Sequence, residues 1–387
     1  MTTMAIDNKD KKVLNVPHLR FPEFSGEWKK HSLGEIGETI IGLTYKPSDV
    51  VDNNGIIVFR SSNIKNGMID YSDLVRVNKH IKDKIITKEN DILVCARNGS
   101  QRLIGKNAII KQEDANNTFG AFMMVYRAND NPFILPLLST KKYFSQVGEN
   151  LGARINQITT SDFNGFEFYF PENHAERTKI AELFRLLDER IATQNKIIED
   201  LKNLKSAISE RLFNAIKGDV VVLEDIGDVV KGKQINGEFL SESGKYYVMN
   251  GGIEPSGFYN DYNVEANTIS ISEGGNSCGY VQFNACPFWS GGHCYTIQNT
   301  TDNVKTEYLY QFLKSKESEI MKLRIGSGLP NIQKKDLAKF KITIPNISEQ
   351  KVISAFLSSF ERKADVEMNF VNLLLEEKQY LLRQMFI

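Results

Sequence analysis

Three cysteines and a histidine in the second half of the chain could in principle hold a metal ion. Cys278, Cys286 and Cys294 lie eight residues apart, and His293 precedes the last of them. Structural zinc sites usually take ligands from close CxxC pairs, and the sequence contains no such pair. We therefore expect the three thiols to fill strands of a core, and we assign no metal ligand and no catalytic residue.

A glycine-containing stretch at residues 227–234, GDVVKGKQ, approaches the pattern of a phosphate-binding loop. Its last residue, Gln234, stands where such a loop needs a Ser or Thr to hold the metal of a nucleotide. A similar stretch at residues 37–44, GETIIGLT, keeps both glycines and lacks the lysine. The glycines are therefore expected to serve a repeated strand and turn, and we assign no cofactor-binding residue.

Polar side chains in loops punctuated by glycine have the chemistry to read DNA. Arg, Lys, Asn and Gln bind the edges of bases, while other basic and hydroxyl groups bind phosphates. Each candidate could equally serve as an ordinary surface or turn residue. The candidates in the first half are Arg60, Ser61, Asn63, Arg97, Asn98, Gln101, Arg102, Lys106, Arg154, Asn156, Gln157 and Thr159. Those in the second half are Asn250, Asn276, Ser277, Tyr280, Arg324, Asn331, Gln333 and Lys334.

Charge is balanced over the whole chain but uneven along it. The 48 Lys and Arg offset 48 Asp and Glu, which argues weakly against DNA binding because phosphate neutralisation supplies most non-specific affinity. Residues 60–111 nevertheless hold eleven basic against five acidic residues, and residues 305–341 hold nine against four. Acidic residues gather in 238–273, so we expect the second half to face DNA mainly with the segment after Lys305.

Length and composition predict a globular protein of more than one domain. The 387 residues suit two or three domains, and 41% hydrophobic with 25% charged residues is ordinary for such a protein. No apolar run approaches the roughly 18 to 20 residues that span a bilayer, and the first residues lack the apolar stretch of a signal peptide. We expect a cytoplasmic protein with no membrane partner.

The two halves of the chain repeat one another. LGEIGETIIG at residues 33–42 matches LEDIGDVVKG at 223–232, and GARINQITTSDF at 152–163 matches GSGLPNIQKKDL at 326–337. Between these anchors each half reads as short strands and turns with one helical stretch, 133–147 or 306–323. The sequence predicts an α+β fold of two similar mixed domains. The expected boundaries are 1–20 for an N-terminal segment, 21–173 and 215–346 for the domains, and 174–214 and 347–387 for two long helices.

The two helices carry an apolar seam typical of a coiled coil. A strict 4,3 spacing leaves eight of ten positions apolar in each helix and places the polar residues at the same two positions. We predict an antiparallel pair, which would relate the domains by an approximate two-fold axis. The seam residues expected to face each other are Leu187, Ile191, Gln194, Ile198, Leu201, Lys205, Ile208 and Leu212 in the first helix and Phe360, Ala364, Glu367, Val371, Leu374, Lys378, Leu381 and Met385 in the second.

The polar seam positions suggest a register, because a buried polar group is costly unless it meets a partner. Pairing Lys205 with Glu367 and Lys378 with Gln194 leaves every other layer apolar, as with Leu201 against Val371. The paired stretch of about 26 residues would be near 39 Å long. Half-sites on B-DNA are separated by roughly 34 to 36 Å, so the helix pair could act as a ruler. A coiled-coil scaffold that never binds DNA is the alternative.

The chain resembles the specificity subunit of type I restriction-modification systems along nearly its whole length. The resemblance rests on VPHLRFPEFSGEW at residues 16–28 followed by LGEIG, on GSGLPNIQKKDL before a strand and a proline, and on the helices ERTKIAELFRLLDERI and EQKVISAFLSSFERK. It implies that each domain reads one half of a split site in double-stranded DNA. The helices would set the unread gap and dock two methyltransferase subunits, which restriction subunits join. S-adenosylmethionine, ATP and magnesium would belong to those partners, leaving this chain non-catalytic.

Missing motifs agree with that division of labour. The methyltransferase motif NPP(Y/F) is absent, and Asn131, Pro132 and Phe133 are expected to form a turn before a helix. An enzyme centred on His293 and Cys294 is a third reading, but no base or metal group accompanies them.

Overall fold

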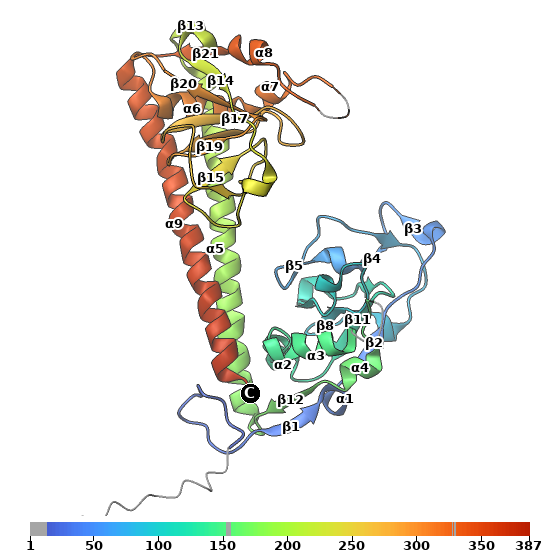
Figure 1. Ribbon diagram of the computed structural model, residues 1–387. Helices are drawn as coiled ribbons and strands as arrows, with labels where there is room; N and C mark the ends of the chain where they lie inside the picture. Colours follow the sequence, from blue (N-terminus) through green and yellow to red (C-terminus); the bar gives the residue numbers. More distant parts are fainter. Residues whose placement is uncertain (1–13, 152–155, 327, 329) are drawn as a thin grey trace, which may run out of the picture. The chain divides into compact units, whose positions relative to one another are not determined.

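The computed structural model describes residues 14–151, 156–326, 328 and 330–387. The chain divides into two compact units, unit 1 (Met1–Thr193 with Val371–Ile387) and unit 2 (Gln194–Phe370). Each unit contains one mixed domain and part of both long helices, α5 (His174–Ala215) and α9 (Ile347–Met385) (Figure 1). In the part of the chain that the structure describes, no helix is long and apolar enough to cross a bilayer.

Unit 1 is built on an antiparallel sheet with the strand order β2-β11-β8-β9. Its central strand β8, with the sequence ILVC, is buried along its whole length because sheet neighbours and core side chains cover it on all sides. The sheet strands are β2 (Glu38–Ile41), β8 (Ile92–Cys95), β9 (Asn107–Ile109) and β11 (Met123–Arg127). A second sheet has the order β10-β4-β7-β3, with β3 (Val50–Val51), β4 (Ile56–Phe59), β7 (Arg76–Val77) and β10 (Thr118–Phe119). The remaining elements are β1 (Lys29–Ser32) paired with β12 (Glu167–Phe170), β5 (Ile64–Lys65) paired with β6 (Met68–Ile69), α1 (Leu33–Ile36), α2 (Asn131–Leu137), α3 (Lys141–Leu151) and α4 (Thr160–Asn164).

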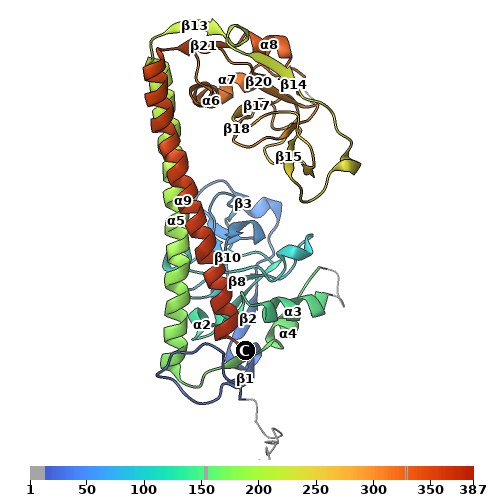
Figure 2. The ribbon, with the colours of Figure 1, turned by 60° about the vertical axis from the view of Figure 1, so that its left-hand side comes forward.

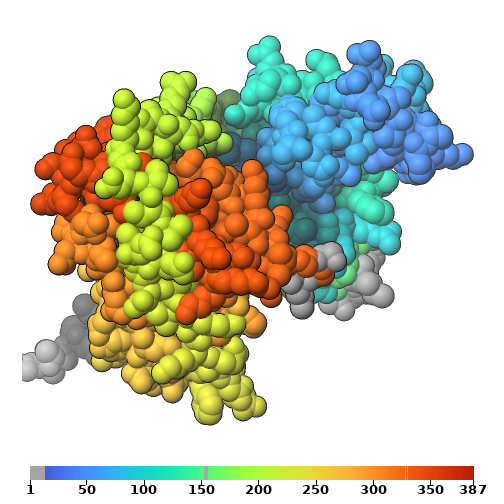
Figure 3. Space-filling view, turned by 90° about the horizontal axis from the view of Figure 1, so that it is seen from above, coloured from blue at the N-terminus to red at the C-terminus, as the bar shows by residue number. Residues whose placement is uncertain are grey.

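Unit 2 repeats this topology. Its main sheet has the order β14-β20-β17-β18, in which each strand corresponds to one of β2, β11, β8 and β9. These strands are β14 (Asp228–Lys231), β17 (Thr268–Ser272), β18 (Val281–Asn284) and β20 (Cys294–Gln298). The smaller sheet joins β15 (Tyr246–Met249) to β16 (Phe258–Tyr259) and β19 (Trp289–Ser290), and the helices are α6 (Thr306–Ser315), α7 (Glu317–Met321) and α8 (Lys334–Ala338). Strand β13 (Asp219–Val222) after α5 pairs with β21 (Lys341–Ile344) before α9, and their yellow-green and orange-red segments lie side by side in Figure 3.

Two glycines of the repeat mark the same close approach of backbones in both domains. A Cβ on Gly42 would lie 2.2 Å from the carbonyl oxygen of Gly120, and one on Gly232 would lie 2.2 Å from that of Gly291. No side chain fits at that distance. Residues 228–231 form strand β14. The stretch whose sequence resembles a phosphate-binding loop is therefore a strand that ends where two backbone segments lie close together.

The structure corrects two expectations about local structure. The helical stretch before each repeated loop is broken into two helices, α2 and α3 in unit 1 and α6 and α7 in unit 2. Pro136 has no backbone N–H to donate, and α2 ends one residue after it. The cysteine prediction is also wrong in part, because Cys278 is buried in a turn and Cys286 is exposed, leaving Cys294 as the one of the three on a buried strand.

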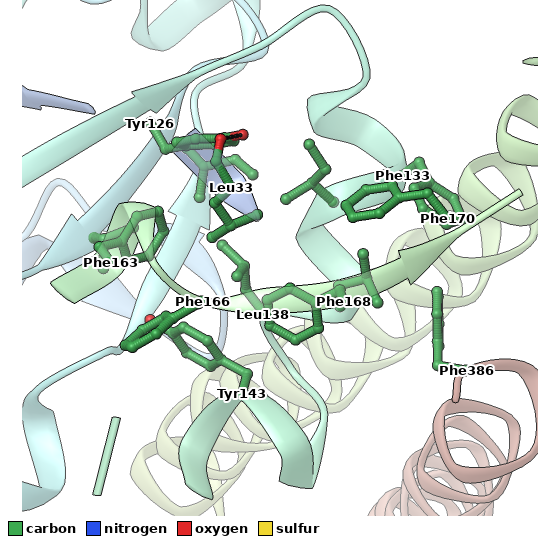
Figure 4. Packing of buried hydrophobic residues seen from close by; sticks show 14 of the residues in the cluster. Leu33, Tyr126, Phe133, Leu138, Tyr143, Phe163, Phe166, Phe168, Phe170 and Phe386 are labelled. Carbon is green, nitrogen blue, oxygen red and sulfur yellow. Dashed lines mark hydrogen bonds between the residues drawn. The ribbon is translucent and has the colours of Figure 1, made fainter. Parts of the chain in front are cut away.

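The end of each long helix is anchored in a hydrophobic core. In unit 1 Phe386, just after α9, points toward Phe133 and Phe170 (Figure 4), and its ring centroid lies 5.7 Å from that of Phe133. Phe213, near the end of α5, holds the corresponding place in unit 2, 5.3 Å from Phe312. Both rings are buried. The repeat therefore uses one helix end per domain as part of its core.

The helices α5 and α9 lie side by side and run antiparallel in each unit (Figures 1 and 2). All the predicted seam residues are buried or half-buried. The predicted register is wrong, because Lys205 pairs with Glu361 at 2.6 Å and Lys378 pairs with Asp188 at 2.5 Å. Gln194 instead donates a hydrogen bond to Glu367.

These three contacts follow the internal repeat. Moving 173 residues along the chain turns Lys205 into Lys378 and Asp188 into Glu361, so the two ion pairs are equivalent. The same step turns Gln194 into Glu367, so these two residues contact their own repeat equivalents.

The observed register predicts a crosslink that the earlier pairing does not. Cysteines introduced at positions 194 and 367 should form a disulfide readily, because the native side chains are in contact. Non-reducing gel electrophoresis of the double variant measures it. The pair at positions 201 and 371 is the control and should remain reduced under the same oxidant; efficient crosslinking there instead would restore the rejected register.

Candidate nucleic-acid interface

In unit 1 the loop after β8 contacts the repeated loop before α4, and together they hold four of the predicted DNA-reading residues. The Ile158 N–H donates to the Ala96 carbonyl at 2.9 Å, and Arg97 forms a backbone bridge with Gln157. The Asn98 side chain donates to the Ser61 hydroxyl at 2.9 Å, and the Asn156 side chain donates to the Gly99 carbonyl at 3.1 Å. Arg97, Asn98, Asn156 and Gln157 therefore lie on one surface, which we call the unit 1 loop surface.

Arg97 supplies the positive charge of the unit 1 loop surface. Its side chain is exposed, and the guanidinium carbon lies 5.1 Å from the centre of the Phe122 ring. The backbone N–H groups of Ala96 and Arg97 both donate to the Phe122 carbonyl at 3.0 Å. Among the described residues no carboxylate forms an ion pair with Arg97, so its donors remain available to a ligand.

The other first-half candidates divide into occupied and free residues. Asn63 is fully buried, and its amide donates to the Asp70 and Asp73 carbonyls, so its side chain is occupied within the domain. Arg60 pairs with Asp73 at 2.8 Å. Thr159 caps α4 by accepting from the Asp162 N–H. Gln101 and Arg102 are exposed, Lys106 is half-buried, and Arg154 lies outside the described residues.

In unit 2 the loop after β17 meets the repeated loop in the same way. The Ile332 N–H donates to the Glu273 carbonyl at 2.8 Å, and Asn331 forms backbone bridges with Gly274 and Ile325. Asn276 is exposed and Ser277 half-buried in the turn that follows. We call Gly274, Asn276, Ser277 and Asn331 the unit 2 loop surface.

Of the remaining second-half candidates, some are held by contacts within the protein and others are exposed to a ligand. Asn250 is half-buried, and its side-chain oxygen accepts from the His293 N–H at 3.1 Å, so a framework contact occupies it. Tyr280 is half-buried, with the Lys314 ammonium 3.9 Å from its ring centre. Arg324 and Lys334 are exposed, and Gln333 stands at the N-terminal cap position of α8.

A charged cluster beside the unit 2 loop surface was not predicted from the sequence. Glu273 is 8% exposed; its Oε1 accepts from Lys231 at 2.6 Å and from the Tyr295 hydroxyl at 3.0 Å. Its Oε2 has no hydrogen-bond partner, and the His293 Nδ1 lies 3.7 Å from it. Burial and the hydrogen bond to Glu273 raise the pKa of the Tyr295 hydroxyl well above its usual range. Tyr295 therefore stays protonated and serves as a donor.

Within residues 14–151, 156–326, 328 and 330–387, no group of three or more His, Cys, Asp or Glu side chains could hold a metal ion. Burial raises the pKa of the Cys294 thiol to about 11, which keeps it protonated and unreactive at neutral pH. The arrangement of both loop surfaces suits hydrogen bonding to a polar macromolecule.

Comparison with known proteins agrees with the duplicated fold. The model of the type I restriction modification DNA specificity domain matches residues 25–203 and 217–374. A putative type I specificity subunit of Mycoplasma pneumoniae is 34% identical over 161 residues, which are 41% of this chain and 42% of that relative. The match therefore spans less than half of that relative's length. A putative type I restriction enzyme specificity subunit of Methanocaldococcus jannaschii is 24% identical over 391 residues, 89% of each protein. The crystal structure of a type I restriction-modification S subunit from M. genitalium shares the fold, with a TM-score of 0.64 at 20% identity over 96% of this chain and 99% of that one.

Proposed function

Because the chain belongs to the family of the type I restriction modification DNA specificity domain, we propose that it recognises a two-part DNA site on behalf of partner enzymes. Each unit would read one half-site in double-stranded DNA. The observation that carries the proposal is the duplicated loop surface, in which the contact of Ile158 with Ala96 recurs as that of Ile332 with Glu273. Two similar surfaces on one chain are what a split site requires.

On and beside each loop surface are groups of the kinds that read bases and bind phosphates. Unit 1 presents the exposed Arg97 and Arg102, and unit 2 presents Asn276, Arg324 and Lys334. Amide and guanidinium groups bind base edges, whereas lysines mainly neutralise phosphates. The chain would perform no chemistry itself, and S-adenosylmethionine, ATP and magnesium would be bound by its partners.

A second apolar stripe on the long helices supports docking of those partners. On α9 it consists of Val352, Val366, Leu373 and Tyr380, which are separated by multiples of seven residues and are 53% to 69% exposed. On α5 the residues one position before the seam include Leu186, Ile197 and Leu204, which are 38% to 51% exposed. Leu373 and Tyr380 belong to unit 1, whereas Ile197 and Val366 belong to unit 2. Each unit therefore carries its own part of an exposed stripe.

Helices of methyltransferase subunits are the partners that suit these stripes. Apolar side chains repeating every seven residues are the pattern by which one helix accepts another, and exposed apolar surface of this extent marks an interaction site. One stripe segment per unit would allow two methyltransferase subunits to bind to one chain. Restriction subunits would join that assembly.

The test is to express the full chain with its methyltransferase partner and map methylated adenines in the DNA of the host. We expect one split motif, with two half-sites and a fixed gap, that disappears when this chain is omitted. A scaffold without DNA binding would produce no motif that depends on the chain. In the same complex Leu373→Asp should lower co-purification of the methyltransferase about tenfold or more, because a charge enters an apolar contact. Asn372→Asp, which adds the same charge at the next exposed position, is the control and should leave co-purification unchanged.

A further inference from the structure

The two units carry different side chains at one equivalent place beside their loop surfaces. Ile41 ends β2 and Lys231 ends β14, and the repeat aligns them. Phe122 precedes β11 and His293 precedes β20, and their carbonyls accept equivalent hydrogen bonds from the Ala96 N–H at 3.0 Å and the Glu273 N–H at 2.9 Å. We call this place the strand-end site. It comprises Ile41, Arg97 and Phe122 in unit 1 and Lys231, Glu273 and His293 in unit 2.

Four side chains of the strand-end site are unusually open for residues at the ends of core strands. Ile41 and Phe122 are each 59% exposed. The side chains of Lys231 and His293 are 52% and 64% exposed. Large apolar residues with this exposure stabilise a fold little, so their place beside the loop surface points to a ligand.

We infer that the strand-end site is where each unit selects a base pair, an inference that rests on the proposed function. In unit 1 the Arg97 guanidinium, held over Phe122, donates to O6 and N7 of a guanine. In unit 2 the Lys231 ammonium, held by Glu273 beside His293, donates to acceptor atoms of a base in the other half-site.

The geometry in unit 1 prepares Arg97 for that contact. A guanidinium is a planar fork of donors that matches the two acceptors of guanine, and a stacked ring fixes its plane. Phe122 lies under the guanidinium at 5.1 Å and contacts the same backbone through its carbonyl. Phe122 is thus a positioning residue, which orders the fork before DNA arrives and lowers the entropy lost on binding.

In unit 2 the buried carboxylate of Glu273 lowers the stability of the fold unless a ligand compensates for it. Glu273 is buried with Oε2 unsatisfied, whereas buried carboxylates in proteins are normally fully paired. Its Oε1 fixes the Lys231 ammonium at 2.6 Å, and His293 stands at the other oxygen. Glu273 is accordingly a positioning residue, while Lys231 and His293 reach solvent.

The difference between the units follows from their task. A two-part site with unlike half-sites needs unlike side chains on one scaffold. The backbone contacts of the strand-end site are the same in both units, but the cation comes from a different element in each. Arg97 follows β8 in unit 1, where unit 2 has Gly274, and Lys231 ends β14 in unit 2, where unit 1 has Ile41. Conserving the framework while changing the polar groups is how such a scaffold would acquire a new target.

The test uses the complex of the full chain with its methyltransferase partner and duplex oligonucleotides in which each position of the two mapped half-sites is varied singly. Arg97→Ala should weaken binding to the intact site about 5- to 150-fold and remove the preference at one base pair of the first half-site. Phe122→Ala should reduce the preference at the same base pair, and Phe122→Trp should restore it. Lys231→Ile and Glu273→Gln should each alter one position of the second half-site.

Each half-site is the control for variants in the opposite unit. A uniform loss of affinity on every duplex would overturn the inference while leaving the proposed function intact. Unchanged preferences in Arg97→Ala, Phe122→Ala, Lys231→Ile and Glu273→Gln would do the same. A wild-type complex that shows no sequence preference would reject both.

Discussion

Replacing Phe386 with alanine is expected to lower the free energy of unfolding of unit 1 by about 3 to 5 kcal/mol, the usual cost of removing a buried aromatic ring. Phe386 is 7% exposed and packs against Phe133 and Phe184 at 5.7 Å and against Trp28 at 6.4 Å. The cavity would open between the N-terminal part of the domain and the last turn of α9. Urea unfolding followed by Trp28 fluorescence in a Trp289→Phe background measures the change.

The repeat supplies a matched control for this variant. Phe213→Ala removes the equivalent ring, which packs against Tyr308 and Phe312 in unit 2. It should lower the stability of unit 2, reported by Trp289 in a Trp28→Phe background, and leave the Trp28 transition of unit 1 in place. If Phe386→Ala left the Trp28 transition unchanged, α9 would not be part of the unit 1 core.

The seam of the long helices could be predicted from sequence because burial follows a short period. Every residue that the 4,3 spacing selects is buried or half-buried, as the repeat of apolar positions implies. The prediction of the helix register was wrong for a separate reason. It assumed that polar seam residues must face one another, yet Lys205 and Lys378 extend along the seam edge to Glu361 and Asp188. The length of a lysine side chain frees it from the layer in which its backbone lies.

The loop candidates could be predicted only as a set. Glycine and polar residues marked these loops, and the structure places residues 97–98 of one beside residues 156–157 of the other, which the sequence analysis did not predict. Whether a side chain is free depends on distant partners. Asn63 closes a turn through the carbonyls of Asp70 and Asp73, which its sequence context does not reveal.

Apart from Arg97, the residues of the strand-end site were not predicted from the sequence, because they are neighbours only through the sheet. Phe122 and Ile41 read as ordinary apolar strand residues, and both are exposed because each sits just beyond the covered part of its strand. Glu273 counted as one more acid in an acidic stretch, although Lys231 holds it 42 residues away. Aligning the two halves would have supplied a signal, since Ile41 and Lys231 occupy the same repeat position.

Removing the carboxylate of Glu176 is expected to destabilise unit 1 by about 3 to 5 kcal/mol, because it breaks an ion pair whose carboxylate is fully buried and leaves the half-buried Arg20 without that partner. Glu176 is fully buried in the first turn of α5. Arg20 binds it with two hydrogen bonds of 2.7 Å, and the Trp28 indole N–H lies 3.3 Å from the same carboxylate. In Glu176→Ala both donors lose their acceptor while the packing around them remains. Urea unfolding followed by Trp28 fluorescence measures the loss of stability. The segment that holds Arg20 should also be cleaved faster by trypsin, which limited digestion measures.

The control is Lys179→Ala, because Lys179 and Glu23 link the same segment to the same helix at the surface. This substitution should cost no more than about 1 kcal/mol. Equal effects of the two substitutions would mean that the buried pair holds the segment no more firmly than an exposed one does.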